Sequence, residues 1–158
     1  MANRMMLVQV TELETKTKSV FLMSQEQIDQ HWDNIQLLMH ECPGFYDFYT
    51  PEWLYKAAQN RDIQLWALSD GEIRGIVVTQ ILVFPVQKVF EILAAAGIGL
   101  LHFFQEMQDV FDYIAKDAGC KTIICRTRPG IERLLRKQGR GIKISSVVSR
   151  EVGESRRQ

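Results

Sequence analysis

Apolar side chains recur along this chain with two different periods, and the changes of period predict the order of its elements. An apolar run at residues 20–23 predicts a strand. Ser24 and Gln27 then form a capping-box pattern ahead of apolar residues at helical spacing. We therefore expect a first helix over residues 25–41, which Pro43 and the glycine after it end.

An aromatic loop, residues 45–49, follows the first helix. After it, Thr50 supplies a capping side chain and the next residue is a proline, which suits the first helical position. A second helix is expected over residues 51–59. The aromatic loop and residues 1–18, a flexible arm or an extra edge strand, are candidates for partner contacts.

Three consecutive apolar runs then predict strands that pair antiparallel. They cover residues 63–68, 73–84 and 88–93, and the turn at residues 69–72 has the composition of a hairpin. The third strand is expected to run into a small-residue turn over residues 94–99. A strand that enters a helix through glycines directs unpaired N–H groups of the helix start at an anion.

The second half of the chain alternates helices and strands. A helix with one apolar stripe is expected over residues 100–118, followed by a buried strand at residues 121–125. A short helix at residues 131–138 and a final strand at residues 142–148 complete a mixed α/β (α+β) pattern. We expect one folded domain over residues 19–152 and a polar tail at residues 153–158.

Composition excludes several classes of protein. No apolar run approaches the length of a membrane span, and the first ten residues lack the features of a signal peptide. The three cysteines, Cys42, Cys120 and Cys125, are odd in number and show no Cys-x-x-Cys spacing, so we expect reduced and mostly buried thiols. The three histidines share no ligand spacing, so no metal site is assigned.

Charge is divided unequally along the chain. Residues 1–120 carry 8 Lys and Arg against 16 Asp and Glu, whereas residues 121–158 carry 11 against 3. Opposite charge faces would support self-assembly or docking on a charged partner, unless the two parts interleave in the fold and cancel. The segment Lys121 to Lys143 holds eight cations and one acid, and this density also suits a salt-sensitive contact with nucleic acid.

The order of the expected elements resembles the fold of the GNAT (Gcn5-related N-acetyltransferase) superfamily, over about residues 19–152. This resemblance implies a twisted, mostly antiparallel sheet of six or seven strands with about four helices. In that family a Gln/Arg-x-x-Gly-x-Gly/Ala turn after the fourth strand holds the pyrophosphate of coenzyme A through backbone N–H groups. The matching segment here runs from Ala94 through Gly97 and Ile98 to Gly99.

Three departures from the family pattern bear on activity. Ala94 stands where the family has a polar residue, and no Lys or Arg occurs between Lys88 and Lys116. The position of the thiolate-protonating tyrosine holds Leu135, and the aromatic that usually follows the glycine after it is Arg140. Glu91 is the one carboxylate near the position of a catalytic base, although a strand acid with a structural role would look the same. The two glycines also suit close strand-to-helix packing.

A narrower resemblance extends over most of the chain from Val20 onward. The stretches VFLMSQEQIDQHWDNI, YTPEWLYKAAQNRDIQLWAL, GIVVTQILVFPVQKVFEI and AGCKTIICRTRPGIERLL are similar to the small GNAT-like proteins that tailed bacteriophages and prophages encode among their virion genes. This resemblance implies a phage origin. It also implies a location in the host cytoplasm during infection, or in the virion.

Two functions follow as expectations from the sequence. The first is a catalytically degenerate GNAT-fold protein that binds no cofactor and acts as a structural or assembly component of a phage particle, through contacts with phage structural proteins. The second is an active N-acetyltransferase that uses acetyl-CoA, held by Gly97, Ile98 and Gly99, with Glu91 acting on the amine directly or through water. The sequence alone ranks the first ahead of the second.

Overall fold

A mixed five-stranded sheet organises the fold. The computed structural model describes residues 17–42, 44–97, 99–125, 133 and 137. The strand order is β1-β2-β3-β4-β5, in which β1 to β4 pair antiparallel and β5 is parallel to β4. This arrangement confirms the expected α+β class. The expected final strand at residues 142–148 lies outside the described residues, as does all of the N-terminal arm before residue 17.

Two short helices follow the first strand, β1 (Ser19–Leu22). They are α2 (Gln25–Gln30) and α3 (Trp32–His40). The expectation of a single helix over residues 25–41 is therefore wrong, because the helix is interrupted at His31. The capping box is confirmed, because the backbone N–H of Gln27 donates to Ser24 Oγ at 3.2 Å and the N–H of Ser24 donates back to Gln27 Oε1 at 2.9 Å.

The second helix of the sequence pattern is confirmed as α5 (Pro51–Gln59). Thr50 caps it, and its Oγ1 accepts from the backbone N–H of Trp53 at 3.1 Å. The aromatic segment before it is not a loop throughout, because Phe45–Phe48 forms the one-turn helix α4. Its rings pack on one another, with the Phe45 and Tyr49 centroids 4.9 Å apart, so part of the aromatic segment serves the core.

Three strands then form an antiparallel meander, as expected. They are β2 (Gln64–Ser69), β3 (Ile73–Val83) and β4 (Lys88–Gly97). The third is four residues longer than the sequence predicts. The segment Ala94–Gly97, expected as part of a turn, pairs with residues 75–78 of β3 and continues the strand.

A one-turn 3-10 helix, η1 (Leu100–Phe103), leads into α6 (Phe104–Asp117), which is the helix expected over residues 100–118. After it, β5 (Cys120–Cys125) returns alongside β4. The expectation that this strand is buried is wrong for the described structure, because only Cys120 is partly covered. Cys42 is also half-buried and Cys125 is exposed, so the cysteines are less buried than expected.

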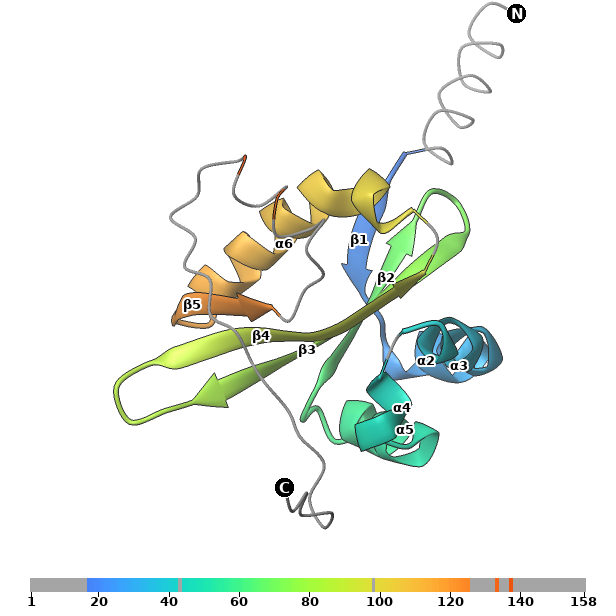
Figure 1. Ribbon diagram of the computed structural model, residues 1–158, viewed down its shortest axis with the longest axis horizontal. Coiled ribbons are helices and arrows are strands. Elements are labelled where there is room, and N and C mark those ends of the chain that lie inside the picture. Colours follow the sequence, from blue (N-terminus) through green and yellow to red (C-terminus); the bar gives the residue numbers. More distant parts are fainter. Residues whose placement is uncertain (1–16, 43, 98, 126–132, 134–136, 138–158) are drawn as a thin grey trace, which may run out of the picture. The chain divides into compact units, whose positions relative to one another are not determined.

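The helices α2 to α5 cover one face of the sheet and α6 covers the other (Figure 1). Side chains on the two faces form two cores. On the first face, Ile76, Val78 and Ala94 pack with buried residues of α2, α3, α4 and α5. On the second face, Val77 and Phe90 pack against Phe111 of α6. This alternation along one strand is the period of two that half-buried strands show.

The chain divides into two compact units, Met1–Arg126 and Thr127–Gln158. The elements above all belong to the first unit. In the second, Arg133 and Lys137 are the described residues, and both are helical and exposed. They fall within the short helix expected over residues 131–138, whose remaining residues lie outside the described part of the chain.

Candidate functional site

The described pairing of β4 with β5 covers the first half of β4. It runs as far as Ile92 and Cys125, the last described residue before the segment 126–132, and β4 continues for five more residues. Among the described residues no strand pairs with that side of β4 beyond Ile92. Leu93 is an extra residue in β4, because Val78 pairs with Ala94 while Thr79 pairs with Ile92. A bulge bends its strand and increases the local twist, so the course of β4 changes at Leu93.

Glycine suits the two positions after the bulge, Gly97 and Gly99, for different structural reasons. A Cβ on Gly97 would lie 2.4 Å from the carbonyl oxygen of Arg74 and 2.4 Å from Cα of Gly75, so only glycine allows β3 to approach β4 here. Gly99 instead has a φ of 72° and open space around it, with the nearest atom, Cβ of His102, at 3.7 Å. It is the N-terminal capping residue of η1, in the left-handed region that favours glycine.

Three sequence-predicted cofactor residues differ in their placement. Gly99 does stand at a helix start, as expected. Ala94 does not belong to the turn, because it lies in β4 and packs in the first core, where it is 7% exposed. Ile98 lies outside the described residues. The expected corner is therefore shorter than the sequence pattern indicates, and it begins at Gly97.

Glu91 lies two residues before the bulge in β4. It pairs with Ile124 of β5, one position before the last described β4–β5 pair, and it is 7% exposed. Its neighbour Phe90 faces the second core, so Glu91 faces the side of the sheet that α2 to α5 cover. Gln80 Nε2 donates to Glu91 Oε2 at 3.1 Å, and within the described part of the chain this is the hydrogen bond that holds the carboxylate.

The partner of Glu91 was missed in the sequence, although a signal for it existed. The turn that joins β3 to β4 brings the N–H of Phe84 to the carbonyl of Gln87 at 2.9 Å. Antiparallel register then counts outward from the turn and places Gln80 opposite Glu91, as the structure does. Two polar residues that face each other in otherwise apolar strands therefore form a detectable pair.

The charges nearest the glycine corner also come from elsewhere in the chain. Arg74 of β3 lies next to Gly97 through its backbone, and its guanidinium pairs with Asp70 at 3.0 Å and Glu72 at 3.2 Å. Lys18 Nζ pairs with Glu106 at 3.2 Å and donates to the carbonyl of His102 at 3.0 Å. The sequence shows no cation in the turn itself, but the fold supplies two cations around it, each already paired with carboxylates.

Several expectations concern residues that the structure does not describe. Among these residues are Leu135 and Arg140, which stand at the family's tyrosine and aromatic positions. Of the eight cations from Lys121 to Lys143, the structure describes Lys121, Arg133 and Lys137, all exposed. A nucleic-acid contact of this segment and self-assembly through opposite charge faces therefore stay predictions.

The described part of the chain shows neither a metal-binding cluster nor a membrane-spanning helix. No group of three or more His, Cys, Asp or Glu side chains there could hold a metal ion. None of the helices described is long and apolar enough to cross a bilayer.

Comparison with solved structures identifies the fold. The ribosomal-protein-alanine N-acetyltransferase from Brucella melitensis biovar Abortus 2308 matches with a TM-score of 0.63 at 13% sequence identity, over 87% of this chain and 100% of the other. A GNAT family acetyltransferase from Staphylococcus aureus matches with a TM-score of 0.56 at 13% identity, over 86% and 99% of the two chains. The aminoglycoside N-acetyltransferase AAC(6')-Iy, in complex with CoA, matches with a TM-score of 0.58 at 10% identity, over 88% and 96%.

The sequence matches no protein-family model and no curated protein. The structural matches establish that this chain has the GNAT fold, as its element order predicts. They concern the fold only, because their identities to this chain are 10 to 13%. They do not bear on the narrower likeness to phage proteins.

Proposed function

We propose that this protein is an N-acyltransferase that binds an acyl-CoA along β4 beyond the bulge at Leu93 and uses Glu91 as the base. The observation that carries the proposal is this bulge, which lies two residues after the almost fully buried Glu91 and four residues before Gly97. Solved proteins with this fold include an N-acetyltransferase in complex with CoA. The proposal therefore reverses the ranking that the sequence alone gives.

The residues of β4 beyond the bulge fit coenzyme A through their backbone. In this proposal, the backbone polar groups of β4 beyond Leu93 form hydrogen bonds with the extended ligand. Gly99 leaves the N–H groups at the start of η1 accessible to an anion such as pyrophosphate. Coenzyme A, when bound, would supply the acyl group as an activated thioester.

The side chains around the corner fit the cofactor less well than the backbone does. Arg74 and Lys18 are near, but Asp70, Glu72 and Glu106 neutralise them. We expect acyl-CoA binding that depends mainly on backbone donors, and hence weakly on ionic strength. Replacement of a paired cation should cost little affinity in comparison with a substitution at Gly99.

Glu91 is placed to accept a proton from an attacking amine. Its carboxylate is held by Gln80, is almost excluded from solvent and faces the side of α2 to α5, from which the amine would approach. The proton moves to Glu91 directly or through one water molecule. No described residue is assigned as the acid for the leaving thiolate, and proximity of the two substrates supplies much of the acceleration in such a complex.

Two measurements test this function. At a concentration 100-fold above Kd, acetyl-CoA should stabilise the protein by about 2.7 kcal/mol and raise Tm by roughly 5–10 °C. With an amine panel, thiol release should depend on Glu91, and Glu91→Gln should lower kcat by about 100-fold or more without changing the thermal shift. An unchanged Tm with saturating acetyl-CoA would remove the proposal.

A second candidate function is a structural or assembly component of a tailed phage particle, whose cofactor site no longer operates. The apolar tip of the β3–β4 hairpin favours it, because Val83, Phe84 and Val86 are 74%, 49% and 88% exposed. Exposed apolar side chains gathered at one turn are common at protein contacts. If this candidate holds, the protein should co-elute with a phage portal or tail protein in light-scattering chromatography, and a Val83→Ser, Val86→Ser variant should lose that association.

A further inference from the structure

The hairpin that joins β3 to β4 extends beyond the neighbouring strand. The pairing of β2 with β3 reaches Thr79, whereas β3 continues to Val83. Figure 1 shows this hairpin projecting past the start of β2. A tight turn closes it, in which the N–H of Phe84 donates to the carbonyl of Gln87 at 2.9 Å. We call residues 83–86 the hairpin tip.

The hairpin tip is apolar and open to solvent. Val83, Phe84 and Val86 are 74%, 49% and 88% exposed, and the residue between the last two is a proline. No charged residue occurs in the sequence between Arg74 and Lys88. Exposed strand ends of soluble proteins commonly carry charges that prevent association. An exposed apolar tip without them indicates a contact with another apolar surface.

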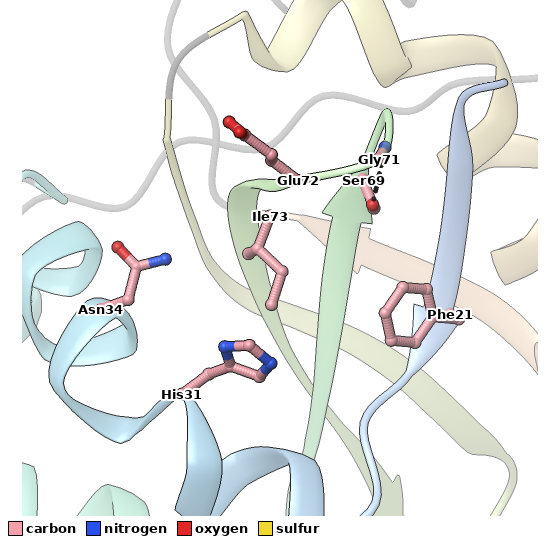
Figure 2. A pocket seen from close by; sticks show the side chains of 7 residues that line it. All are labelled: Phe21, His31, Asn34, Ser69, Gly71, Glu72 and Ile73. Carbon is pink, nitrogen blue, oxygen red and sulfur yellow. Dashed lines mark hydrogen bonds between the residues drawn. The ribbon is translucent and has the colours of Figure 1, made fainter. Parts of the chain in front are cut away.

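The other end of β3 differs from the hairpin tip. Ile73, its first residue, lines a hollow together with Phe21 of β1 and His31 at the junction of α2 and α3 (Figure 2). Phe21 and Ile73 are half-buried and pack against the first core. The apolar side chains at that end of the strand therefore serve the fold, whereas those of the tip remain exposed.

Apolar side chains occupy more than one side of the projecting hairpin. Neighbouring residues of a strand point to opposite faces of the sheet, so Leu82 and Val83 present apolar surface on different sides. Val86 lies in the turn itself, beyond the ends of both strands. A flat protein surface covers one side of such a hairpin, whereas the interface of a lipid bilayer surrounds a projecting turn. The shape of the tip therefore favours a bilayer.

Two lysines lie behind the hairpin tip. Lys88 begins β4, and its Nζ donates to the carbonyl of Ala118 at 3.5 Å. Lys121 of β5 precedes Thr122, whose hydroxyl donates to Gln87 Oε1 at 2.8 Å. Both lysines are exposed. These hydrogen bonds place the start of β5 beside the base of the tip, so the two cations stand on the same end of the sheet.

The neighbouring charges leave this end of the sheet positive. Lys116 and Asp117, at the end of α6, are both exposed and offset each other. Glu91, the next acid along β4, is buried. Lys88 and Lys121 therefore supply an excess of positive charge next to the apolar tip. A lysine near an anionic lipid surface strengthens binding by about fivefold.

We propose that the hairpin tip inserts into the interface of an anionic lipid bilayer, with Phe84 and Val86 toward the acyl chains and Lys88 and Lys121 at the level of the phosphates. The apolar tip supplies the burial, and the two lysines select an anionic surface. The insertion is peripheral, because a single turn enters the interface.

This inference is independent of acyl transfer. It uses neither Glu91 nor Gly99, so it stands whether or not the protein is an acyltransferase. A protein partner at the same tip belongs to the second candidate function above, and the experiment below distinguishes the two.

Sedimentation of the full chain with large unilamellar vesicles tests the proposal. One set of vesicles is an equimolar mixture of phosphatidylcholine and phosphatidylserine, and the other is phosphatidylcholine alone. We expect saturable binding to the mixed vesicles. Binding to phosphatidylcholine alone should be at least about 10-fold weaker, because both lysines lose their anionic partners there.

Two variants and two matched controls locate the contact. Val86→Ser should weaken binding to the mixed vesicles by about 10-fold, because it removes the most exposed apolar side chain of the tip. Lys121→Gln should weaken it by about fivefold. Leu37→Ser removes an exposed apolar side chain from α3, and Lys56→Gln removes an exposed cation from α5. Both controls should bind like the wild type, and thermal melting reports whether each variant is folded.

A fluorescence measurement reports insertion itself. Phe84→Trp places an indole at the tip, and brominated lipids in the mixed vesicles should quench its emission. The wild type, whose tryptophans are residues 32, 53 and 66, provides the background. We expect stronger quenching in Phe84→Trp than in the wild type.

The outcomes are decisive in either direction. Weaker binding of Val86→Ser, unchanged binding of the controls and quenching at residue 84 would establish the site. Absence of binding to the mixed vesicles would overturn it. Binding that Val86→Ser leaves unchanged would also overturn it, because the basic segment Lys121 to Lys143 would then account for the attraction. Light scattering that shows self-association through the tip, without vesicle binding, would identify a second copy as the occupant instead.

Discussion

Gln80 and Glu91 face each other across the β3–β4 hairpin, and the amide of Gln80 donates to the carboxylate of Glu91 at 3.1 Å. The pair lies just before the bulge at Leu93, and the carboxylate of Glu91 is almost fully buried there. A buried charge needs hydrogen-bonding partners, which makes Gln80 a positioning residue for Glu91.

Replacement of Gln80 by Leu tests this role. The variant removes the donor while it keeps a side chain of similar size, so the carboxylate of Glu91 loses its orientation. We expect kcat for acyl transfer to fall by about 10-fold, with the affinity for acetyl-CoA unchanged. Steady-state kinetics and calorimetry measure the two quantities. Ile81→Val, on the opposite face of the same strand, serves as the control, and a Gln80→Leu enzyme with wild-type kcat would show that Gln80 does not position the base.

A second buried polar pair supports the sheet on its other face. Trp66 Nε1 donates to Thr79 Oγ1 at 2.8 Å, and this hydroxyl donates in turn to Gln64 Oε1 at 2.9 Å. Thr79 is fully buried, so Thr79→Val leaves the indole N–H unpaired and should cost about 1–3 kcal/mol of unfolding free energy.

The matched variant Thr79→Ser keeps the hydroxyl and removes one methyl group. It should cost only about 1 kcal/mol. Urea unfolding followed by tryptophan fluorescence compares the two variants. A larger loss for Ser than for Val would mean that packing, and not the hydrogen bond, decides stability at this position.

Two leucines test how the helices cover the first core. Leu54 of α5 is completely buried, whereas Leu37 of α3 is 67% exposed. Leu54→Ala should therefore destabilise the protein by about 2–5 kcal/mol, because it leaves a cavity. Leu37→Ala should change stability by less than about 0.5 kcal/mol. Urea unfolding measures both, and similar losses at the two positions would contradict the packing of α3 and α5 described above.

The sequence predicts those parts of the fold that local chemistry determines. The capping box of Ser24 and the cap at Thr50 are short-range patterns, and both are present. The break at His31 has no such signal, since neither glycine nor proline stands there. The strand at Ala94–Gly97 was missed because alanine and glycine disfavour strands by themselves, and pairing with β3 overrides this preference.

The candidate site shows the same division. Gly99 and Glu91 could be selected as candidates from the sequence because they stand at the positions of the turn and of the base that the resemblance to the GNAT family implies. Arg74 could not, since it reaches Gly97 only through the pairing of β3 with β4, and Lys18 reaches His102 across 84 residues of chain. Long-range partners therefore complete the site, and one-dimensional patterns do not contain them.

The central proposal is that acyl-CoA binds along β4 beyond Leu93 and rests on the backbone at Gly99. Isothermal titration with acetyl-CoA tests it most directly, with Gly99→Ala compared with Gly119→Ala. Both glycines have positive φ values, 72° and 79°, and no close neighbour, so both substitutions should cost a similar backbone strain of about 1 kcal/mol. We predict that the wild type and Gly119→Ala bind acetyl-CoA with equal affinity and that Gly99→Ala binds at least about 10-fold more weakly, since its methyl group obstructs the helix start. No measurable heat with the wild type, or equal affinities for the two variants, would contradict the account.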